Sequence, residues 1–125
     1  MFDWRRPNNL GVSNGRFAAC RRTPNCVSSQ ADPGDGEHYI APLQGTMEAL
    51  RRAVAAMPRT AVITDKKNYL YVEFRSKLLG YVDDVEFFHD GAVIQVRSAS
   101  RLGRRDFGVN RKRVEDLRAL LKQRP

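Results

Sequence analysis

The chain has 125 residues, of which 42% are hydrophobic and 29% are charged. This length and composition predict one globular domain with one core, and they exclude a globally disordered chain. No apolar run approaches the roughly 20 residues that a membrane-spanning helix needs, and the first residues lack the apolar stretch of a secretory signal. We therefore expect a cytoplasmic protein, provided that Met1 is the native start.

The positive charge is concentrated near the C-terminus. The formal net charge is +8, from 22 Lys and Arg and 14 Asp and Glu. Residues 1–96 carry 12 basic and 11 acidic side chains, whereas residues 97–125 carry 10 basic and 3 acidic side chains, a net charge of +7. This asymmetry favours an acidic partner for the C-terminal part. A solvated basic helix that has no partner would show the same asymmetry.

The first part of the chain predicts an arm followed by a helix. Residues 1–37 are rich in Pro, Gly, Asn and Ser, and we interpret them as an extended arm that packs on a domain formed by residues 38–125. Residues 38–41 predict a short edge strand. Residues 43–57 predict an amphipathic helix that Pro58 ends. Its apolar stripe consists of Leu43, Met47, Leu50, Val54 and Met57.

Four strands and a second helix are predicted next. The strand ranges are 61–64, 69–76, 81–88 and 92–100. Alternation is clearest where Leu70, Val72 and Phe74 share one face. Short turns join the strands, so neighbouring strands should pair antiparallel. In the last helix, Asn110 has the character of an N-cap, and the apolar stripe consists of Val114, Leu117, Leu120 and Leu121.

Together these elements predict an α+β fold. We expect a four-stranded antiparallel meander, with one helix before and one after the sheet, both on one face, and an irregular N-terminal arm. Phe74 and its two apolar neighbours on the strand should be buried against Met47, Leu50 and Val54. The opposite face of the sheet would be exposed to solvent or covered by the arm.

Two long motifs resemble the signatures of a known family. Residues 20–29 read Cys-Arg-Arg-Thr-Pro-Asn-Cys-Val-Ser-Ser, and a second motif spans residues 97–103 and continues over residues 106–113. Both are similar to the domain of unknown function 1499 family of uncharacterised bacterial and plastid proteins, and the resemblance covers nearly the whole chain. Arg21 stands where the family usually has Pro, which makes the cysteine loop less rigid. The resemblance implies a fold and a place to look, but no activity and no cofactor.

The two cysteines allow more than one interpretation. Cys20 and Cys26 are separated by five residues, which does not match the usual zinc-ligand spacing of roughly two to four, so we expect no metal. A turn at Pro24 and Asn25 should bring the two Cα atoms within about 7 Å. The pair is then a disulfide, which a reducing cytoplasm would keep open or reversible, or two small buried residues that anchor the arm.

The basic motif predicts an anion site where the last strand meets the last helix. With Asn110 as N-cap, residues 111–113 place three cations at the positive end of the helix dipole, which is unfavourable. A bound anion could compensate for them, and so could internal carboxylates that lock the loop to the sheet. The predicted anion-binding residues are Arg97, Ser98, Ser100, Arg101, Asn110, Arg111 and Arg113. The competing carboxylates are Asp83, Asp84 and Asp106.

Three functional hypotheses follow from these residues. The first is a non-catalytic binding or interaction module whose basic site takes a small anion or an acidic lipid headgroup. The second is a hydrolase or thiol-redox enzyme that uses Ser28, Ser29 and His38 or the cysteine pair, although no Gly-x-Ser-x-Gly elbow surrounds these serines. The third is nucleic-acid binding through the C-terminal charge. Only Phe107 interrupts the basic run, so a stacking platform for single strands is not supported.

Overall fold

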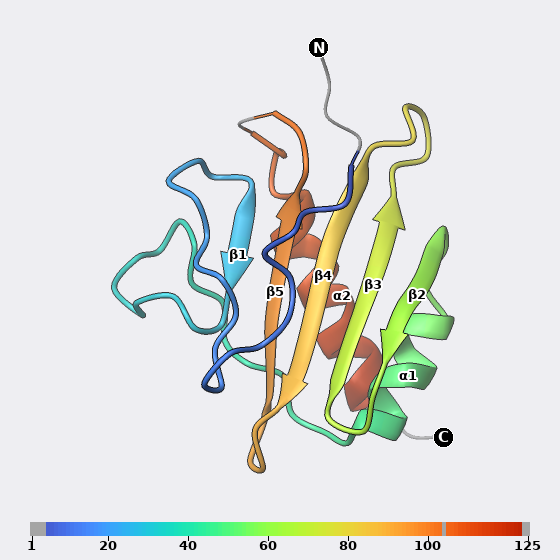
Figure 1. Cartoon of the computed structure of the whole chain (residues 1–125). Coiled ribbons are helices and arrows are strands. Elements are labelled where there is room, and N and C mark those ends of the chain that lie inside the picture. Colours follow the sequence, from blue (N-terminus) through green and yellow to red (C-terminus); the bar gives the residue numbers. More distant parts are fainter. Residues whose placement is uncertain (1–4, 104, 124–125) are drawn as a thin grey trace.

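A single antiparallel sheet organises the molecule. The computed structural model describes residues 5–103 and 105–123. The elements in chain order are β1 (Cys26–Ser28), α1 (Met47–Ala55), β2 (Thr60–Asp65), β3 (Tyr69–Arg75), β4 (Val82–His89), β5 (Ile94–Ser100) and α2 (Val109–Lys122). Figure 1 shows both helices behind the sheet and the N-terminal segment crossing in front of it. The predicted α+β class and the two helices on one face are confirmed. Among the described residues, neither helix is long and apolar enough to cross a bilayer.

The sheet has five strands in the described part of the chain, so the predicted number of four is wrong. Its order is β1-β5-β4-β3-β2, and the extra strand β1 pairs antiparallel with β5 from within the arm. Three residues are too few to show an alternating pattern, and the pairing depends on the exposed edge that β5 offers. The edge strand predicted at residues 38–41 is also wrong, because only Tyr39 forms an isolated bridge, with Ser28.

Helix α1 begins four residues later than predicted. Thr46 is its N-cap, and the threonine hydroxyl accepts a hydrogen bond from the Ala49 N–H at 3.1 Å. Leu43, the first member of the predicted stripe, lies ahead of the helix in an extended bridge with Ile94. Leu43 is nevertheless fully buried, so the apolar pattern identified a core residue and misplaced the start of the helix.

The apolar core lies between the sheet and the two helices. Phe74 and its neighbours Leu70 and Val72 are buried in one cluster with the α1 stripe, as predicted. Helix α2 adds Val114 and Leu117 to the same cluster. Burying one such side chain contributes about 1.5–3 kcal/mol relative to leaving it exposed. The remaining core members include Met47, Leu50, Val54, Val85, Phe87, Ile94 and Val96.

The other face of the sheet is polar and also buried. Because successive strand residues point to opposite faces, the strands that supply the core also present charged side chains to the arm. The Gly11 N–H donates to Glu86 on β4 at 2.6 Å, and Arg6 donates to Glu73 on β3 at 2.7 Å. The first part of the arm therefore crosses this face (Figure 1), and its contact with Glu73 places Arg6 over the central strands.

Candidate functional site: an arginine-lined pocket between arm and sheet

The structure divides the seven predicted anion-binding residues between the two faces of the sheet. Arg97 is opposite Glu86 in the β4–β5 register, on the face under the arm, and Arg101 reaches Asp84 on that same face. Ser98 and Ser100 stand one and three residues after Arg97 in the strand, so their side chains point to the opposite face, toward the helices. Arg111 lies outside both groups and donates to the Gly36 and Glu37 carbonyls at 3.2 and 3.3 Å. The seven residues do not converge on one site.

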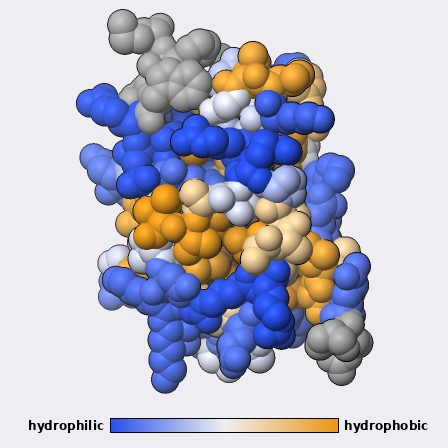
Figure 2. All heavy atoms as spheres, turned by 90° about the vertical axis from the view of Figure 1, so that its right-hand side faces the viewer, coloured by the Kyte–Doolittle hydropathy of each residue, from blue (hydrophilic) through white to orange (hydrophobic). Residues whose placement is uncertain are grey.

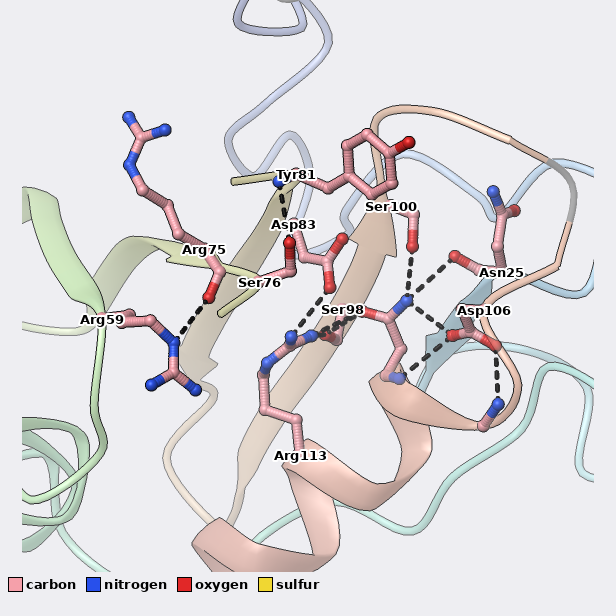
Figure 3. A network of polar contacts seen from close by, with 12 residues as sticks. Asn25, Arg59, Arg75, Ser76, Tyr81, Asp83, Ser98, Ser100, Asp106 and Arg113 are labelled. Carbon is pink, nitrogen blue, oxygen red and sulfur yellow. Dashed lines mark hydrogen bonds and ion pairs between the residues drawn. The ribbon is translucent and has the colours of Figure 1, made fainter. Parts of the chain in front are cut away.

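On the helix side, a polar network holds the start of α2 (Figure 3). The buried Asn110 amide donates to Ser100 at 2.9 Å, to Asp106 at 2.7 Å and to the Asn25 carbonyl at 3.2 Å, and its oxygen accepts from Ser98 at 2.6 Å. The prediction that Asn110 is the N-cap of this helix is wrong. That position belongs to Gly108, while the Asp106 carboxylate accepts from the Gly108 and Asn110 N–H groups at 2.9 and 3.0 Å.

The cation closest to this network also has an internal partner. Arg113 pairs with Asp83 on β4 at 2.7 Å, and its guanidinium stacks over the Phe74 ring at 4.7 Å. Burial raises the pKa of the Asp83 carboxyl, although the charge of Arg113 opposes that shift. Internal carboxylates thus occupy the positions where an anion was expected. The contacts of Asp83 and Asp106 tie the helix to the sheet.

Under the arm, Arg101 is the centre of a second network. It forms a bidentate pair with Asp84, with both N–O distances at 2.9 Å, and a further ion pair with Glu73 at 2.6 Å. Hydrogen bonding to Asp84 raises the pKa of Arg101 above its ordinary value. Burial alone would raise the pKa of Glu73, but hydrogen bonds from Arg6, Tyr71 and Arg101 outweigh it and lower that pKa.

Arg97 is a buried cation whose hydrogen-bonding groups are incompletely satisfied by the described residues. Only 7% of it is exposed, its one hydrogen bond runs to the Ala19 carbonyl at 3.4 Å, and its Nε has no partner among the described residues. Burial lowers the pKa of Arg97, attraction by Glu86 and Asp84 opposes that shift in part, and a smaller repulsion by Arg21 adds to it. On the neighbouring strand, Glu86 Oε1 accepts two hydrogen bonds, whereas Oε2 has no partner in the described part of the chain. Buried charged groups without partners are costly.

A pocket of about 590 Å³ opens between the arm and this part of the sheet. Five of its lining residues are arginines, namely Arg5, Arg6, Arg21, Arg97 and Arg101. Asp84 is the carboxylate among the described lining residues, and Asn25, Cys26, Ala99 and Ser100 line the same space. The basic motif correctly indicated Arg97 and Arg101 as neighbours. It missed the three arm arginines, because no sequence pattern shows where an irregular segment crosses a sheet.

The cysteine loop forms one wall of the pocket. Cys20 and Cys26 are joined in a disulfide, with a Cα–Cα distance of 5.7 Å, so the predicted proximity is confirmed. The loop that they close contains Arg21 and Asn25, both of which line the pocket. Asn25 is fixed by donating to the Gly103 carbonyl at 2.8 Å, while its own carbonyl accepts from the Ser100 N–H at 3.0 Å. The disulfide thereby connects the Arg21 end of the loop to β1.

The residues of the hydrolase hypothesis do not form a catalytic arrangement. Both ring nitrogens of His38 are engaged, Nδ1 with Asp35 at 2.7 Å and Nε2 with the Thr23 carbonyl at 2.9 Å. Ser28 Oγ instead accepts from the Gln30 N–H at 3.1 Å, and Ser29 Oγ donates to Gln95 at 2.7 Å. Among the described residues, no group of three or more His, Cys, Asp or Glu could hold a metal ion.

His38 should make the stability of the protein depend on pH. Both acceptors favour the charged imidazolium, and hydrogen bonding to Asp35 raises the pKa of His38. Its stabilisation is therefore complete below the unfolded-state pKa of about 6.5 and is lost as the pH rises through the folded-state pKa. We expect the Tm difference between wild type and His38→Gln to be largest near pH 6 and to shrink in alkaline buffer. A difference that grows with pH would contradict this assignment.

The fold and the site define an α+β protein whose sheet has helices on its apolar face and an N-terminal arm on its charged face. The DUF1499 family, whose description is "Protein of unknown function", matches residues 16–121. The chain belongs to this family, as the resemblance of the two motifs predicted. Neither a curated protein nor a solved structure matches the chain.

Proposed function

We propose that the protein is a non-catalytic binding module that holds an oxyanion in the pocket lined by Arg5, Arg6, Arg21, Arg97 and Arg101. The observation that supports this proposal is the state of Arg97, a buried cation whose Nε has no partner among the described residues. A buried, unpaired donor costs about 1–3 kcal/mol, and more when it is charged. A phosphate, sulfate or carboxylate group in the pocket that Arg97 lines would compensate the charge of this guanidinium.

The charges around the pocket favour an anion with several oxygens. Arg101 already forms two ion pairs, so it positions Asp84 and Glu73. Arg21 and Arg97 instead repel each other. An oxyanion between them would replace that repulsion by two charge-assisted hydrogen bonds, and the planar guanidinium matches the geometry of such oxygens. We therefore assign the direct contacts to Arg97 and Arg21.

The proposal moves the predicted site away from the start of α2. Asp106 already accepts from the first N–H groups there, and Asp83 neutralises Arg113. Of the predicted residues, Arg97, Arg101 and Ser100 line the pocket, whereas Ser98, Asn110, Arg111 and Arg113 do not. The polar network at the start of α2 is thus structural, and the proposed binding site lies under the arm, with Ser100 at the border of both.

Titration of phosphate, sulfate and citrate into the protein, followed by calorimetry, tests the proposal. We expect saturable binding to the wild type and a loss of about tenfold or more in affinity for Arg97→Met and for Arg21→Met, because each removes a charge-assisted contact. Arg111→Met, which removes an arginine at the start of α2, should bind as the wild type does. Circular dichroism of each variant reports whether its fold is retained.

Two results would contradict the proposal. One is the absence of binding of all three anions to the wild type. The other is binding that Arg111→Met abolishes and Arg97→Met retains, which would return the site to the helix start. Loss of anion binding in Arg97→Met, with an unchanged circular dichroism spectrum, would support the proposed site in the pocket.

A further inference from the structure

Large apolar side chains project from two loops of the molecule. In the β3–β4 loop, Leu78 is 90% exposed and Leu79 is 66% exposed, and in the β5–α2 loop Phe107 is 94% exposed. Single exposed apolar residues are normal on protein surfaces. Three exposed apolar side chains on two loops need an explanation if both loops lie at the same end of the molecule.

The sheet register places the two loops at the same end of the molecule. Arg75 at the end of β3 is opposite Val82 at the start of β4, and Asp83 is opposite Ser100 at the end of β5. The β3–β4 loop and the segment after β5 therefore leave the sheet at one edge, the upper end in Figure 1. Figure 2 shows apolar side chains at the upper end of the side it presents, with hydrophilic ones around them.

The charge at this end is positive. In the described part of the chain, four exposed cations lie in or beside the loops, namely Arg59, Arg75, Lys77 and Arg105. Among the described residues of this end, Asp83, Asp84 and Asp106 are engaged with Arg113, Arg101 and Asn110. Glu37 lines a hollow together with Phe107 and Arg105, and its exposed carboxylate offsets one of the four cations. The opposite end has exposed charges of both signs, with Asp65, Asp90, Lys66 and Lys67 around the turns there. Exposed apolar tips thus coincide with an excess of positive charge.

We propose that this end of the molecule docks on the surface of an anionic lipid bilayer. Leu78, Leu79 and Phe107 would enter the boundary between headgroups and acyl chains, while the surrounding cations contact lipid phosphates. The shape of the surface favours a bilayer over a protein partner, because the apolar side chains stand on separate projecting loops. A fluid interface can enclose separate tips, whereas a protein would have to provide matching pockets. This inference goes beyond the pocket and does not depend on its ligand.

Flotation with vesicles tests the docking surface. We expect the wild type to float with phosphatidylcholine vesicles that contain phosphatidylglycerol, to float little with phosphatidylcholine alone, and to be released by salt. The double substitution Leu78→Ser with Leu79→Ser should lower the partition coefficient by about tenfold or more. The matched apolar control is Val62→Ser, on the exposed edge strand β2, which should float as the wild type does.

Charge reversal separates a defined surface from general attraction by the net charge. The pair Lys77→Glu with Arg105→Glu and the pair Lys66→Glu with Lys67→Glu change the net charge equally, at opposite ends of the sheet. We expect only the first pair to release the protein from the vesicles. Equal release by both pairs, or a wild type that does not float, would overturn the proposal.

The pocket variant keeps the two proposals distinguishable. Arg97→Met should float as the wild type does, even where it no longer binds phosphate in solution. A wild-type protein that floats but binds no phosphate would contradict the proposed oxyanion binding in the pocket and support the proposed docking on the bilayer. If Arg97→Met failed to float, the proposed docking surface would be overturned, because binding to vesicles would then depend on the pocket.

Discussion

Replacing Arg101 by Met should lower the free energy of unfolding by about 3–5 kcal/mol. The side chains of Arg101, Asp84 and Glu73 are between 3 and 8% exposed, and the arginine forms ion pairs with both carboxylates. Methionine keeps most of the aliphatic stem and removes the charge, so the packing is largely retained. The large cost arises because two carboxylates remain buried with less compensation, and it can be measured by urea denaturation.

An exposed ion pair provides the matched control. Lys112 and Asp116 form an i,i+4 pair at 2.8 Å on the outer side of α2, where the side chains are 75% and 45% exposed. Lys112→Met should therefore change stability by about 0.5 kcal/mol or less. Equal effects of Arg101→Met and Lys112→Met would mean that the network under the arm is not a buried one.

The second large effect is expected in the apolar core, where Phe87→Ala should cost about 3–5 kcal/mol. Phe87 on β4 is fully buried in the cluster between sheet and helices, so its removal leaves a cavity that rigid neighbours fill only in part. Phe107→Ala makes the same chemical change at an exposed loop position and should stay within about 0.5 kcal/mol of the wild type. Urea denaturation of both variants measures the contrast. A comparable loss in Phe107→Ala would show that its side chain packs on the protein.

The central strands could be predicted because their pattern is local. Leu70, Val72 and Phe74 alternate with polar residues, and short turns such as the one at residues 90–93 require antiparallel neighbours. The core against α1 followed from the same alternation combined with the helical period. These properties depend on residues that are close in sequence.

The arm could not be predicted in the same way. Strand β1 has only three residues, and its pairing with β5 depends on residues some 70 positions away in the chain. The N-cap was misassigned because Asn110 is a common capping residue, whereas its amide is here required inside the network of the β5–α2 junction. In both places, tertiary contacts determine the local conformation.

The residues of the pocket were only partly predictable. The basic motif contains Arg97 and Arg101, which line the pocket, but the grouping of Arg97 with Ser98 conflicts with the alternation of a strand, which places them on opposite faces. That rule, applied to residues 97–99, would have placed Arg97 and Ala99 on the face of the pocket and Ser98 on the face of the helices. The contribution of Arg21 depends on the cysteine loop and on the path of the arm, which the composition of residues 1–37 does not encode.

The contacts of the arm also bear on the order in which the chain folds. Arg6 reaches Glu73 across 67 residues and Gly11 reaches Glu86 across 75, whereas each pair of successive strands from β2 to β5 is joined by a short connection. Closing long loops costs more entropy than closing short ones, and contacts between distant residues slow folding. The meander and its helices can therefore assemble first. While the arm is undocked, the charged face of the sheet is exposed to water, and the cost of desolvating its charges disfavours face-to-face association with other copies.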